Sequence, residues 1–439
     1  MITLKKYQNK IVGIYGLGKT GISAAKTLKK LKAKILCWDD NETARKKAKN
    51  LNFKLGKFWT KSNSIDFIVI SPGINIDKCK IKNFLRNNSK KIITDLDLFF
   101  EINRDSLIIS ITGTNGKSTT CKLIEKIFKT AGYNAITAGN IGNPILNLKI
   151  NKKKILIILE VSSYQLQYSK IFKSKHAAIL NIFPDHLERH KSMLNYTKIK
   201  SKIFYGQDIN DYSYLNSNNN YSKNIKKIFK FKKLKSKLIL VNENSYKHLL
   251  KNLKNSYFKS KGNKENLAFA YKISKNFNIK DQTILKALNS FKGLPHRQEL
   301  IFSKNKFNCV NDSKATSFNA SLQSLMNYKK IYWILGGLPK YQDKFDLKKV
   351  SNKIVRAYVV GKTINFFIKK IKKNLSYKKS YNIKNAINDI LIDIKKNKDT
   401  KFTILLSPAA ASYDQFQNFE ERGNYFKNII ISKLKKLNV

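Results

Sequence analysis

The sequence predicts an α/β protein of three successive units, each with a mainly parallel sheet. Length is the first observation, because 439 residues correspond to about three domains at roughly 150 residues per domain. The second is a regular alternation of short apolar runs with helical stretches, the βαβ pattern of parallel sheets. We expect domains over residues 1–94, 95–295 and 296–439: a Rossmann-like N-terminal domain, a central P-loop-type parallel sheet and a Rossmann-like C-terminal domain.

The first predicted domain contains three short apolar runs with helical character between them. They cover residues 11–16 (IVGIYG), 34–38 (KILCW) and 66–70 (DFIVI), and Ser71-Pro72-Gly73 ends the third. Runs of this length, bounded by turn residues, predict strands.

The second predicted domain begins at residues 106–113 (SLIISITG), a strand that leads into a glycine-containing loop. A helix follows from about Lys117 to Lys129, and Ala131-Gly132 ends it. Residues 209–236 are rich in Asn, Ser, Tyr and Lys, so we expect a surface excursion there and not a linker between cores. Further strands are expected at 154–161, 177–183 and 237–241.

The pattern restarts after Gly293-Leu294-Pro295. Each new apolar run is followed by Gly, Ser or Pro and then by a helical segment, and no internal repeat of solenoid length occurs. Three α/β units are therefore the simplest account. Strands of this last unit are expected near 307–311, 330–335, 356–360 and 402–406.

The chain carries 87 Lys and Arg against 28 Asp and Glu, a formal net charge of +59. Such a charge suggests a nucleic-acid-binding protein as one alternative. Only seven of the basic residues are Arg, however, and the lysines are spread along the whole chain beside many Asn and Ile. Because recognition of nucleic acid favours Arg and one basic face, we expect no nucleic-acid partner; the charge should instead concentrate small anionic ligands.

Cysteine usage indicates a reducing compartment. Cys37, Cys79, Cys121 and Cys309 are far apart and form no C-x-x-C pair, so neither a disulfide framework nor a thiolate zinc site is expected. The opening MITLKKYQNK lacks an apolar core with a cleavage site, and no apolar run reaches about 18 residues. We expect a cytoplasmic protein with no membrane insertion.

Gly16-Leu17-Gly18-Lys19-Thr20-Gly21 follows the first predicted strand, and Asp39 and Asp40 end the second. A helix N-terminus in a G-x-G-x-x-G segment can bind a diphosphate while a carboxylate binds a ribose or base group. The pattern alone is weak evidence. An NAD-dependent oxidoreductase would carry it, and so would a tight βα turn that needs glycine.

The stretch SITGTNGKSTT lies between a predicted strand and a predicted helix. Ile111 stands where the usual G-x-x-x-x-G-K-[ST] pattern has its first glycine, so this phosphate-binding loop is a variant. Backbone N–H groups from Thr114 to Ser118 can surround phosphate oxygens, and Lys117 can offset their charge. The hydroxyl of Ser118 or Thr119 can ligate Mg2+.

Glu160 ends a very apolar strand, His186 follows another, and Lys200 lies fourteen residues after His186. The carboxyl ends of parallel strands face the ligand crevice, so we expect Glu160 and His186 to converge on a nucleotide-bound metal. His186 and His190 are spaced as i and i+4, but Leu187 stands where the zincin pattern has glutamate, which argues against a zinc pair. A solvated loop charge is the alternative for each residue taken singly.

Polar groups also follow the predicted strands of the third unit. Several of them are cationic, and helix N-termini add further donors, so we expect a crevice for an anionic small molecule. Ordinary helix capping explains any one of them alone. The segments are His296-Arg297, residues 311–316 (NDSKAT), 336–340 (GGLPK) and 407–416 (SPAAASYDQF).

Together these motifs resemble the Mur ligase superfamily over essentially the whole chain, and within it the UDP-N-acetylmuramoyl-L-alanine:D-glutamate ligases (MurD type). A folate polyglutamate ligase shares the phosphate loop but is not expected to carry the N-terminal unit. The motifs at 311–316 and 406–424 separate this branch from its sister ligases, as does the opening GLGKTG at 16–21. The motifs are TGTNGKST at 112–119, GNIG at 139–142, EVSSYQL at 160–166, DHLERH at 185–190, LPHR at 294–297, NDSKAT at 311–316 and LSPAAASYDQFQNFEERGN at 406–424.

The resemblance implies an ATP-dependent amide ligase of peptidoglycan synthesis, acting as a monomer on small-molecule substrates. The γ-phosphoryl group of ATP passes to the carboxylate of UDP-N-acetylmuramoyl-L-alanine, and the amine of D-glutamate displaces phosphate from the acyl phosphate. A carboxylate is a poor electrophile until one oxygen becomes a good leaving group, and the charge that spreads in the transfer demands metals and cations.

The resemblance also implies roles for single residues. Lys117 binds the phosphates, Ser118 and Glu160 serve one Mg2+, and His186 with Lys200 serves a second. Lys200 is expected to be carboxylated by CO2, which turns a cation into a carbamate anion able to ligate metal. The remaining implied positions are Gly113, Thr114, Asn115, Gly116, Thr119, Asn263, Asn266, Arg297 and Asp312 for ATP in the central domain and beyond; Gly18, Thr20, Asp39, Ser71, Gly73 and Asn140 for the UDP-sugar; and Lys314, Thr316, Lys340, Ser412 and Phe419 for D-glutamate.

Three departures from the family pattern concern individual contacts and not the reaction. Gly262 stands where the family often has His, and Ser317 replaces a common Asn. The residues after Asp39 differ from the usual uracil contacts.

Overall fold

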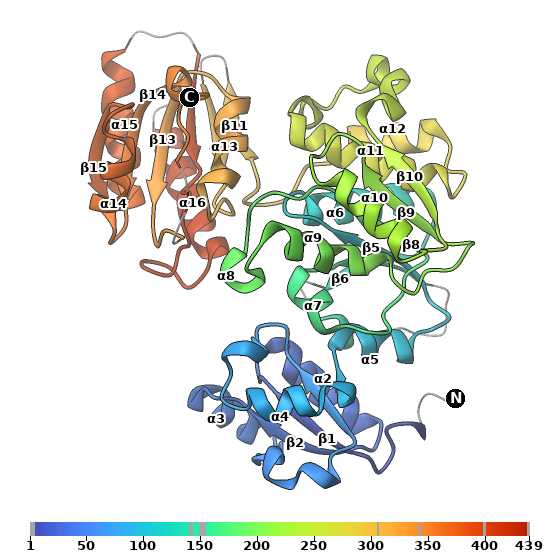
Figure 1. Cartoon of the computed structure of the whole chain (residues 1–439). Helices are drawn as coiled ribbons and strands as arrows, with labels where there is room; N and C mark the ends of the chain where they lie inside the picture. The colour runs from blue at the N-terminus through green and yellow to red at the C-terminus, as the bar shows by residue number, and fades with distance from the viewer. Residues whose placement is uncertain are drawn as a thin grey trace. The chain divides into compact units, whose positions relative to one another are not determined.

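The computed structural model describes residues 5–139, 144–148, 155–304, 307–340, 343, 345–397 and 401–436. It confirms the α/β class, with three sheets that follow one another along the chain (Figure 1). By compactness the chain forms two units: residues 1–291 contain the first two sheets, and residues 292–439 contain the third. Among the residues described, no helix combines the length and the apolar character needed to cross a membrane.

The first sheet has the order β2-β1-β3-β4 and is parallel throughout. Val12 and Ile14 pack against α2 and α3 on one face, while Tyr15 and Ile70 pack toward α4 on the other. Because β1 lies between β2 and β3, the glycine loop after it is flanked by the ends of both. The elements are β1 (Ile11–Tyr15), α2 (Lys19–Lys30), β2 (Lys34–Trp38), α3 (Glu42–Asn50), β3 (Phe67–Ile70), α4 (Lys82–Asn87) and β4 (Ile92–Ile93).

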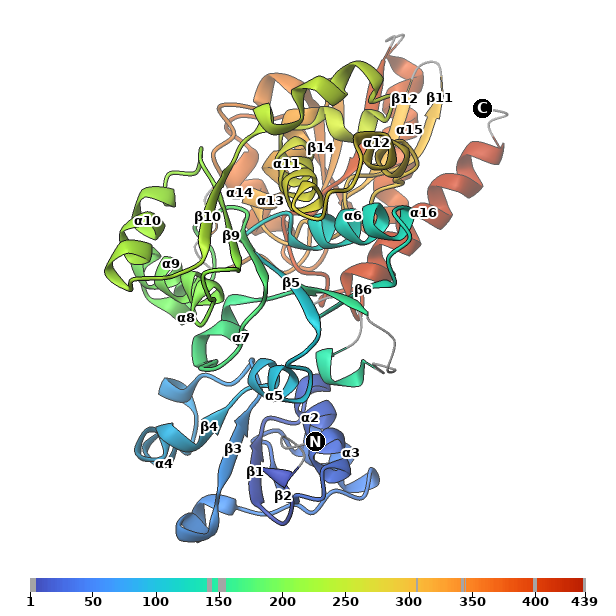
Figure 2. The same cartoon turned by 90° about the vertical axis from the view of Figure 1, so that its right-hand side faces the viewer.

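The second sheet has the order β10-β9-β8-β5-β7-β6, again all parallel. Ile109 and Ile111 pack against α6, α11 and α12, whereas Ile108 packs toward α5, α7 and α9 on the opposite face (Figure 2). All five residues of β7 are buried, and each large aliphatic side chain contributes about 1.5–3 kcal/mol by leaving water. The strands are β5 (Leu107–Thr112), β6 (Ala135–Gly139), β7 (Leu156–Glu160), β8 (His176–Ile179), β9 (Tyr212–Asn216) and β10 (Lys237–Val241).

The helices of this region surround the second sheet and include the segments that carry the predicted site residues. They are α5 (Asp95–Ile102), α6 (Lys117–Thr130), α7 (Ser163–Tyr168), α8 (Leu187–His190), α9 (Met193–Ser201), α10 (Ser222–Phe231), α11 (Lys261–Lys275) and α12 (Asp281–Asn289).

The prediction of a surface excursion over residues 209–236 is wrong. The segment contains β9, which pairs with both β8 and β10 and is buried over four of its five residues. Its polar side chains find partners inside the protein: Ser213 Oγ donates to Gln207 Oε1 at 2.6 Å and lies 2.8 Å from Ser236 Oγ. Satisfied polar groups can be buried at little cost, so a segment of polar composition forms β9, a strand between two others in the sheet.

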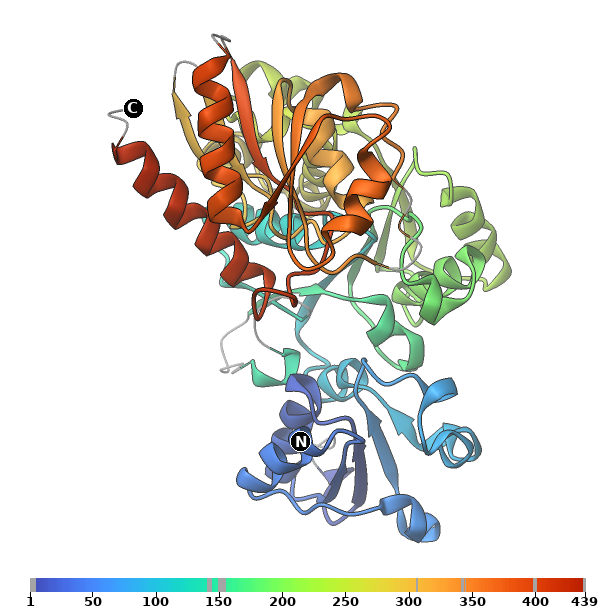
Figure 3. The same cartoon turned by 90° about the vertical axis from the view of Figure 1, so that its left-hand side faces the viewer.

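The third sheet has the order β11-β12-β16-β13-β14-β15 and is parallel except for the antiparallel edge strand β11. Trp333 and Leu335 pack against α13 and α14, and Tyr332 and Ile334 pack against α15 and α16. Figure 3 shows this part of the chain, in orange and red, as strands with helices beside them. The elements are β11 (Glu299–Lys304), β12 (Phe307–Asn311), α13 (Phe318–Asn327), β13 (Ile331–Gly336), β14 (Ile354–Val360), α14 (Ile364–Ile371), β15 (Tyr377–Tyr381), α15 (Ile383–Lys396), β16 (Phe402–Leu406) and α16 (Phe419–Lys436).

Candidate active site

The lysine at the end of the loop between β5 and α6 forms hydrogen bonds with the backbone of that loop. Lys117 Nζ donates to the carbonyl oxygens of Gly113 and Thr114, each at 2.9 Å. Gly116 has a φ of +81°, and a Cβ there would lie 2.1 Å from Asn266 Oδ1, so glycine is required for this close approach to α11. The N–H groups of Thr114 and Asn115, predicted to surround phosphate, donate to the carbonyl and the side chain of Asn181, whereas the N-terminus of α6 is a structure that suits a phosphate.

The asparagines predicted to contact nucleotide both lie on α11. Asn266 Oδ1 accepts a hydrogen bond from Thr120 Oγ1 at 3.2 Å, which fixes it against the phosphate loop. Asn263 Nδ2 donates to the carbonyl of Tyr257 at 2.8 Å at the start of the helix. The structure therefore places Asn266 beside the loop, and the nucleotide contacts of both residues stay predictions.

Ser118 and Glu160 lie together where β5 and β7 end. The two strands pair in parallel with Ile111 opposite Glu160, so the carboxylate sits beside the first turn of α6. Ser118 Oγ donates to Glu160 Oε2 at 2.6 Å, and both residues are buried. A hydroxyl and a carboxylate are the hard oxygen donors that Mg2+ prefers, so this pair fits the predicted metal site.

Lys200 is completely buried on α9, with 1% of its surface exposed. Its Nζ donates to the carbonyl of Gly113 at 2.9 Å and to Thr112 Oγ1 at 3.3 Å. Burial lowers the pKa of this amine well below its usual value, and the nearby charge of Lys117 lowers the pKa further. Compared with an exposed lysine, this environment disfavours the charged form of the Lys200 amine, and its carboxylation stays a prediction.

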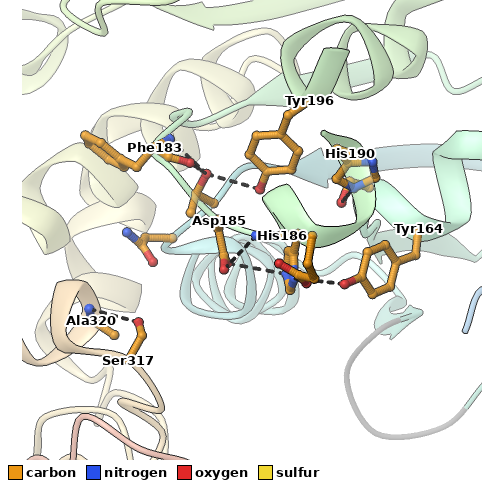
Figure 4. Close-up of polar contacts among 12 residues, drawn as sticks. Tyr164, Phe183, Asp185, His186, His190, Tyr196, Ser317 and Ala320 are labelled. Carbon is orange, nitrogen blue, oxygen red and sulfur yellow. Dashed lines mark hydrogen bonds and ion pairs between the residues drawn. The ribbon is translucent and has the colours of Figure 1, made fainter. Parts of the chain in front are cut away.

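His186 occupies the turn before α8 with a φ of +54°, a conformation uncommon for a residue other than glycine. Its Nδ1 lies 2.9 Å from the hydroxyl of Tyr164 on α7, and its Nε2 lies 3.3 Å from Asp185 Oδ2 (Figure 4). An imidazole nitrogen suits a metal site. The predicted convergence of His186 with Glu160 on one metal stays a prediction.

His190 faces the interior, and its contacts differ from those of His186. Its ring is fully buried, its Nε2 lies 3.0 Å from Ser163 Oγ, and it stacks on Tyr196 at 5.3 Å between centroids. Tyr196 in turn lies under Lys200, whose Nζ is 4.8 Å from the ring centroid. Burial lowers the pKa of His190 to about 4, and within the described part of the chain no group of three metal-ligating side chains is formed.

Sequence reasoning missed this aromatic group, which consists of Tyr164, His190 and Tyr196. The only sequence signal was an aromatic residue within the EVSSYQL motif and a histidine that ends DHLERH. Neither motif reveals that the two segments meet, because their contact depends on the pairing of β5 with β7 and β8.

Asp39 and Ser71, two of the predicted UDP-sugar residues, stabilise the glycine loop after β1. Asp39 Oδ2 accepts a hydrogen bond from the Leu17 N–H at 2.6 Å, and Ser71 Oγ donates to the Gly16 carbonyl at 2.7 Å. Gly18 precedes α2 without a side-chain cap, and Thr20 lies in its first turn. Gly73 follows β3, while the predicted Asn140 lies outside the described residues.

Asp312, predicted to contact nucleotide, is buried inside the third sheet's unit. Its Oδ2 accepts hydrogen bonds from Ser324 Oγ at 2.5 Å and from Ser407 Oγ at 2.8 Å, and its Oδ1 accepts one from the Gln298 N–H at 3.2 Å. Burial raises the pKa of this carboxyl to about 6. The structure thus gives Asp312 a role in holding three segments together, and Arg297, next to Gln298, is half-buried.

Two members of the predicted amino-acid pocket, Lys314 and Phe419, are in contact. Lys314 Nζ lies 3.8 Å from the ring centroid of Phe419 at the start of α16, a cation–π contact that orients the ammonium group. Ser412 is buried, and Thr316 and Lys340 are half-buried in the loops after β12 and β13.

Sequence reasoning also missed Arg422, a buried guanidinium on α16. Its Nε donates to Ser313 Oγ at 3.0 Å, and its Nη2 donates to the carbonyls of Ser313 at 2.8 Å and Ala410 at 2.9 Å. Arg422 therefore links the NDSKAT and SPAAAS loops, a role that only the packed structure reveals.

Comparisons with known proteins identify the family of this chain. Residues 111–283 match the Mur ligase middle domain, and residues 10–93 match the Mur ligase MurD-like N-terminal domain. The UDP-N-acetylmuramoylalanine–D-glutamate ligase of Rickettsia bellii is 36% identical over 445 residues, with 97% of this chain and 98% of the relative covered. This chain belongs to the UDP-N-acetylmuramoylalanine–D-glutamate ligase family. The enzyme of Rickettsia felis is 37% identical over 441 residues, with 95% and 96% covered.

Solved structures of Mur ligases share the fold of this family member. MurF from Acinetobacter baumannii aligns with a TM-score of 0.55 at 14% identity, covering 77% of this chain and 79% of that one. MurC from Thermotoga maritima aligns with a TM-score of 0.54 at 12% identity, covering 97% and 99%. The match over residues 10–93 assigns the G-x-G-x-x-G loop to a Mur ligase domain and removes the NAD-dependent oxidoreductase alternative.

Proposed function

We propose that this chain joins D-glutamate to UDP-N-acetylmuramoyl-L-alanine in an ATP-dependent reaction of peptidoglycan synthesis. Membership of the family supports the overall reaction. The contact of Ser118 with Glu160, at the start of the helix that carries Lys117, supports its chemistry most directly. All three substrates are anionic, and the net charge of +59 raises their concentration near the protein.

The first step is phosphoryl transfer to the sugar-linked carboxylate. One carboxylate oxygen attacks the γ-phosphorus of ATP, and ADP leaves. Lys117 exchanges its two carbonyl acceptors for phosphate oxygens, and the backbone N–H groups at the start of α6 bind the same anion. Ser118 and Glu160 are the residues that would ligate one Mg2+, and such an ion neutralises charge on the phosphoryl group in transfer.

The second step is amide formation. The amine of D-glutamate attacks the acyl carbon, a C–N bond forms, phosphate leaves and the nitrogen loses a proton. Lys314 and Lys340 would pair with the two carboxylates of D-glutamate, and Phe419 orients Lys314. Thr316 and Ser412 add hydroxyl donors to the same pocket. Gly18, Thr20, Asp39, Ser71, Gly73 and Asn140 would bind the UDP-sugar.

Lys200 is proposed to act as a carbamate. Its neutral nitrogen attacks the carbon of CO2, an N–C bond forms, and one proton leaves the nitrogen to give a carbamate anion. The buried amine behind the phosphate loop, with its lowered pKa, supports this reaction. The resulting oxygens, together with His186, would serve a second Mg2+.

The proposal includes the setting of the enzyme. We place it in the cytoplasm as a monomer, with UDP-sugar, ATP and amino acid bound mainly by residues 1–94, 95–295 and 296–439 respectively. The supporting observations are the four cysteines, none of which forms a disulfide, and the family matches to the first two of these regions.

The test is phosphate release from ATP with UDP-N-acetylmuramoyl-L-alanine, measured with D-glutamate, with L-glutamate and with no amino acid. We expect sustained release only with D-glutamate, accompanied by a product whose mass corresponds to the new amide. Release that is indifferent to D-glutamate, with no amide formed, would contradict the proposed function.

A further inference from the structure

Tyr164 lies between the two segments that carry the proposed metal ligands. It is the second residue of α7, which starts three residues after Glu160. Its hydroxyl reaches across to His186 Nδ1 at 2.9 Å, and the two rings lie 4.9 Å apart at 55° (Figure 4). One side chain therefore connects the end of β7 to the turn before α8.

The helix that carries Tyr164 is itself held firmly. Ser162 and Gln165 form a capping box at its N-terminus, Gln165 Nε2 donates to Asp95 Oδ2 at 2.9 Å, and Ser163 contacts the buried His190. A hydroxyl on such a fixed helix can hold a ring on a turn whose backbone conformation is uncommon, as that of His186 is.

Arg189 stacks on the same tyrosine and also contacts the loop after β3, which contains Gly73 and Ile74. Its guanidinium carbon lies 5.1 Å from the Tyr164 ring centroid. Its Nη2 donates to the Ile74 carbonyl at 2.5 Å, and its Nη1 donates to the Gly73 carbonyl at 3.4 Å. Gly73 is one of the residues predicted to bind the UDP-sugar. Arg189 therefore connects the loop after β3 to the Tyr164 ring, which contacts His186.

We propose that Tyr164 is a positioning residue that fixes the His186 imidazole for metal binding, and that Arg189 ties this arrangement to the backbone of Gly73 and Ile74. The inference rests on the proposed function, because metal binding by His186 is part of that function. Either tautomer of His186 satisfies the bond at Nδ1, since the tyrosine hydroxyl can donate or accept, so the ring plane is fixed in both. Groups that orient a metal-binding histidine affect metal affinity without touching the metal.

The test compares two single-hydroxyl deletions on α7. Tyr164→Phe removes the bond to His186 and keeps the ring under Arg189. The matched control is Tyr168→Phe, which removes a hydroxyl that accepts from the Ile76 N–H at 3.1 Å. The Tyr168 ring also lies under Arg189, with its centroid 5.6 Å from the guanidinium carbon, and the bond of its hydroxyl given by the described part of the chain is to Ile76 and not to a proposed metal ligand. Binding of Mn2+ in the presence of ADP is followed by electron paramagnetic resonance, and the thermal midpoint of unfolding is measured for each protein.

We expect Tyr164→Phe to weaken binding of one Mn2+ by about tenfold, the low end of the effect of such supporting groups, with an unfolding midpoint like that of Tyr168→Phe. Mn2+ binding equal in the two variants would overturn the proposal. A second variant, Arg189→Gln, should raise KM for the UDP-sugar more than KM for ATP; equal changes in both would overturn the link to the loop. Because Mn2+ binding needs no turnover, failure of the proposed function would appear separately, as a wild-type protein that binds Mn2+ without D-glutamate-dependent phosphate release.

Discussion

Ser118 and Glu160, 42 residues apart in the sequence, share a 2.6 Å hydrogen bond. The bond exists because β5 and β7 are parallel neighbours, so the start of α6 and the end of β7 emerge at the same edge of the sheet. Strand pairing thus holds the carboxylate beside a helix N-terminus and a hydroxyl, and fixed positioning of this kind reduces the reorganisation needed for phosphoryl transfer.

Glu160→Gln tests that arrangement, because it keeps the size of the side chain and removes its charge. We expect kcat to fall by at least about 100-fold, since a metal ligand should matter more than the supporting groups whose loss typically costs 10–100-fold. Steady-state phosphate release over a Mg2+ titration measures the effect. Glu125→Gln is the control, because Glu125 lies on α6 but pairs with Lys122 and Lys129; equal losses in both variants would contradict a metal role for Glu160.

Lys200→Ala should abolish turnover and regain part of it when formate or acetate is added. The added carboxylate would take the place of the proposed carbamate in the cavity left by the buried side chain. Turnover is measured against carboxylate concentration for this variant and for Lys202→Ala, which removes a half-buried lysine that donates to the Gln167 carbonyl at 2.9 Å. Unchanged activity of Lys200→Ala, or equal rescue of both variants, would refute the carbamate.

Asp95→Asn should stabilise the protein at pH 7.5 and have little effect at pH 4. Asp95 is buried, its Oδ1 has no hydrogen-bond partner among the described residues, and burial raises its pKa from 3.8 to about 6. A carboxyl whose folded pKa is raised contributes stability below its unfolded pKa, and that contribution is lost as the pH rises through about 6. At about 1.4 kcal/mol per pKa unit, the charged form costs roughly 2–3 kcal/mol.

Chemical denaturation at the two pH values measures the free energy of unfolding of both proteins. A gain for the Asn variant that is the same at pH 4 and pH 7.5 would show that the effect does not come from the charge. A loss at pH 7.5 would show that the acceptor for Gln165 Nε2 matters more than the buried charge.

Phe419→Leu should raise KM for D-glutamate about fivefold, since the lost cation–π contact with Lys314 is worth about 1 kcal/mol. The leucine keeps an apolar side chain at the start of α16 but no longer orients the ammonium group. Initial rates over a D-glutamate series give KM, and KM for ATP should stay within about twofold. Phe416→Leu is the control, because Phe416 packs on Tyr425 and not on Lys314; a KM for D-glutamate that changes equally in both variants would argue against the pairing.

The fold was largely predictable because many of its strands are short apolar runs in the sequence. Residues 11–16, 34–38 and 106–113 all proved to contain strands of the expected sheets. β9 was not predicted because its buried positions include Ser213, whose hydroxyl forms hydrogen bonds with Gln207 and Ser236. Alternation of apolar and polar residues indicates which positions are buried only where the polar groups face solvent. Ser213 is polar but buried, so the pattern does not apply to β9.

The sequence provided candidate site residues one by one, but it did not provide the contacts between them. Motif spacing identified Lys117, Glu160 and His186 as candidates, yet no spacing shows that Tyr164 reaches His186 or that Arg422 joins two loops of the third sheet's unit. Such contacts link segments that are distant in sequence, so they depend on strand order, which local pattern does not determine. Their roles in catalysis stay predictions.

The central claim, that ATP activates the sugar-linked carboxylate before the amine attacks, is tested most directly with oxygen isotopes. UDP-N-acetylmuramoyl-L-alanine labelled with 18O in both carboxylate oxygens is turned over with ATP and D-glutamate, and the released phosphate is analysed by mass spectrometry. An acyl phosphate predicts one 18O atom in each phosphate released and one retained in the amide. Phosphate free of 18O, with amide formed at the normal rate, would contradict the account.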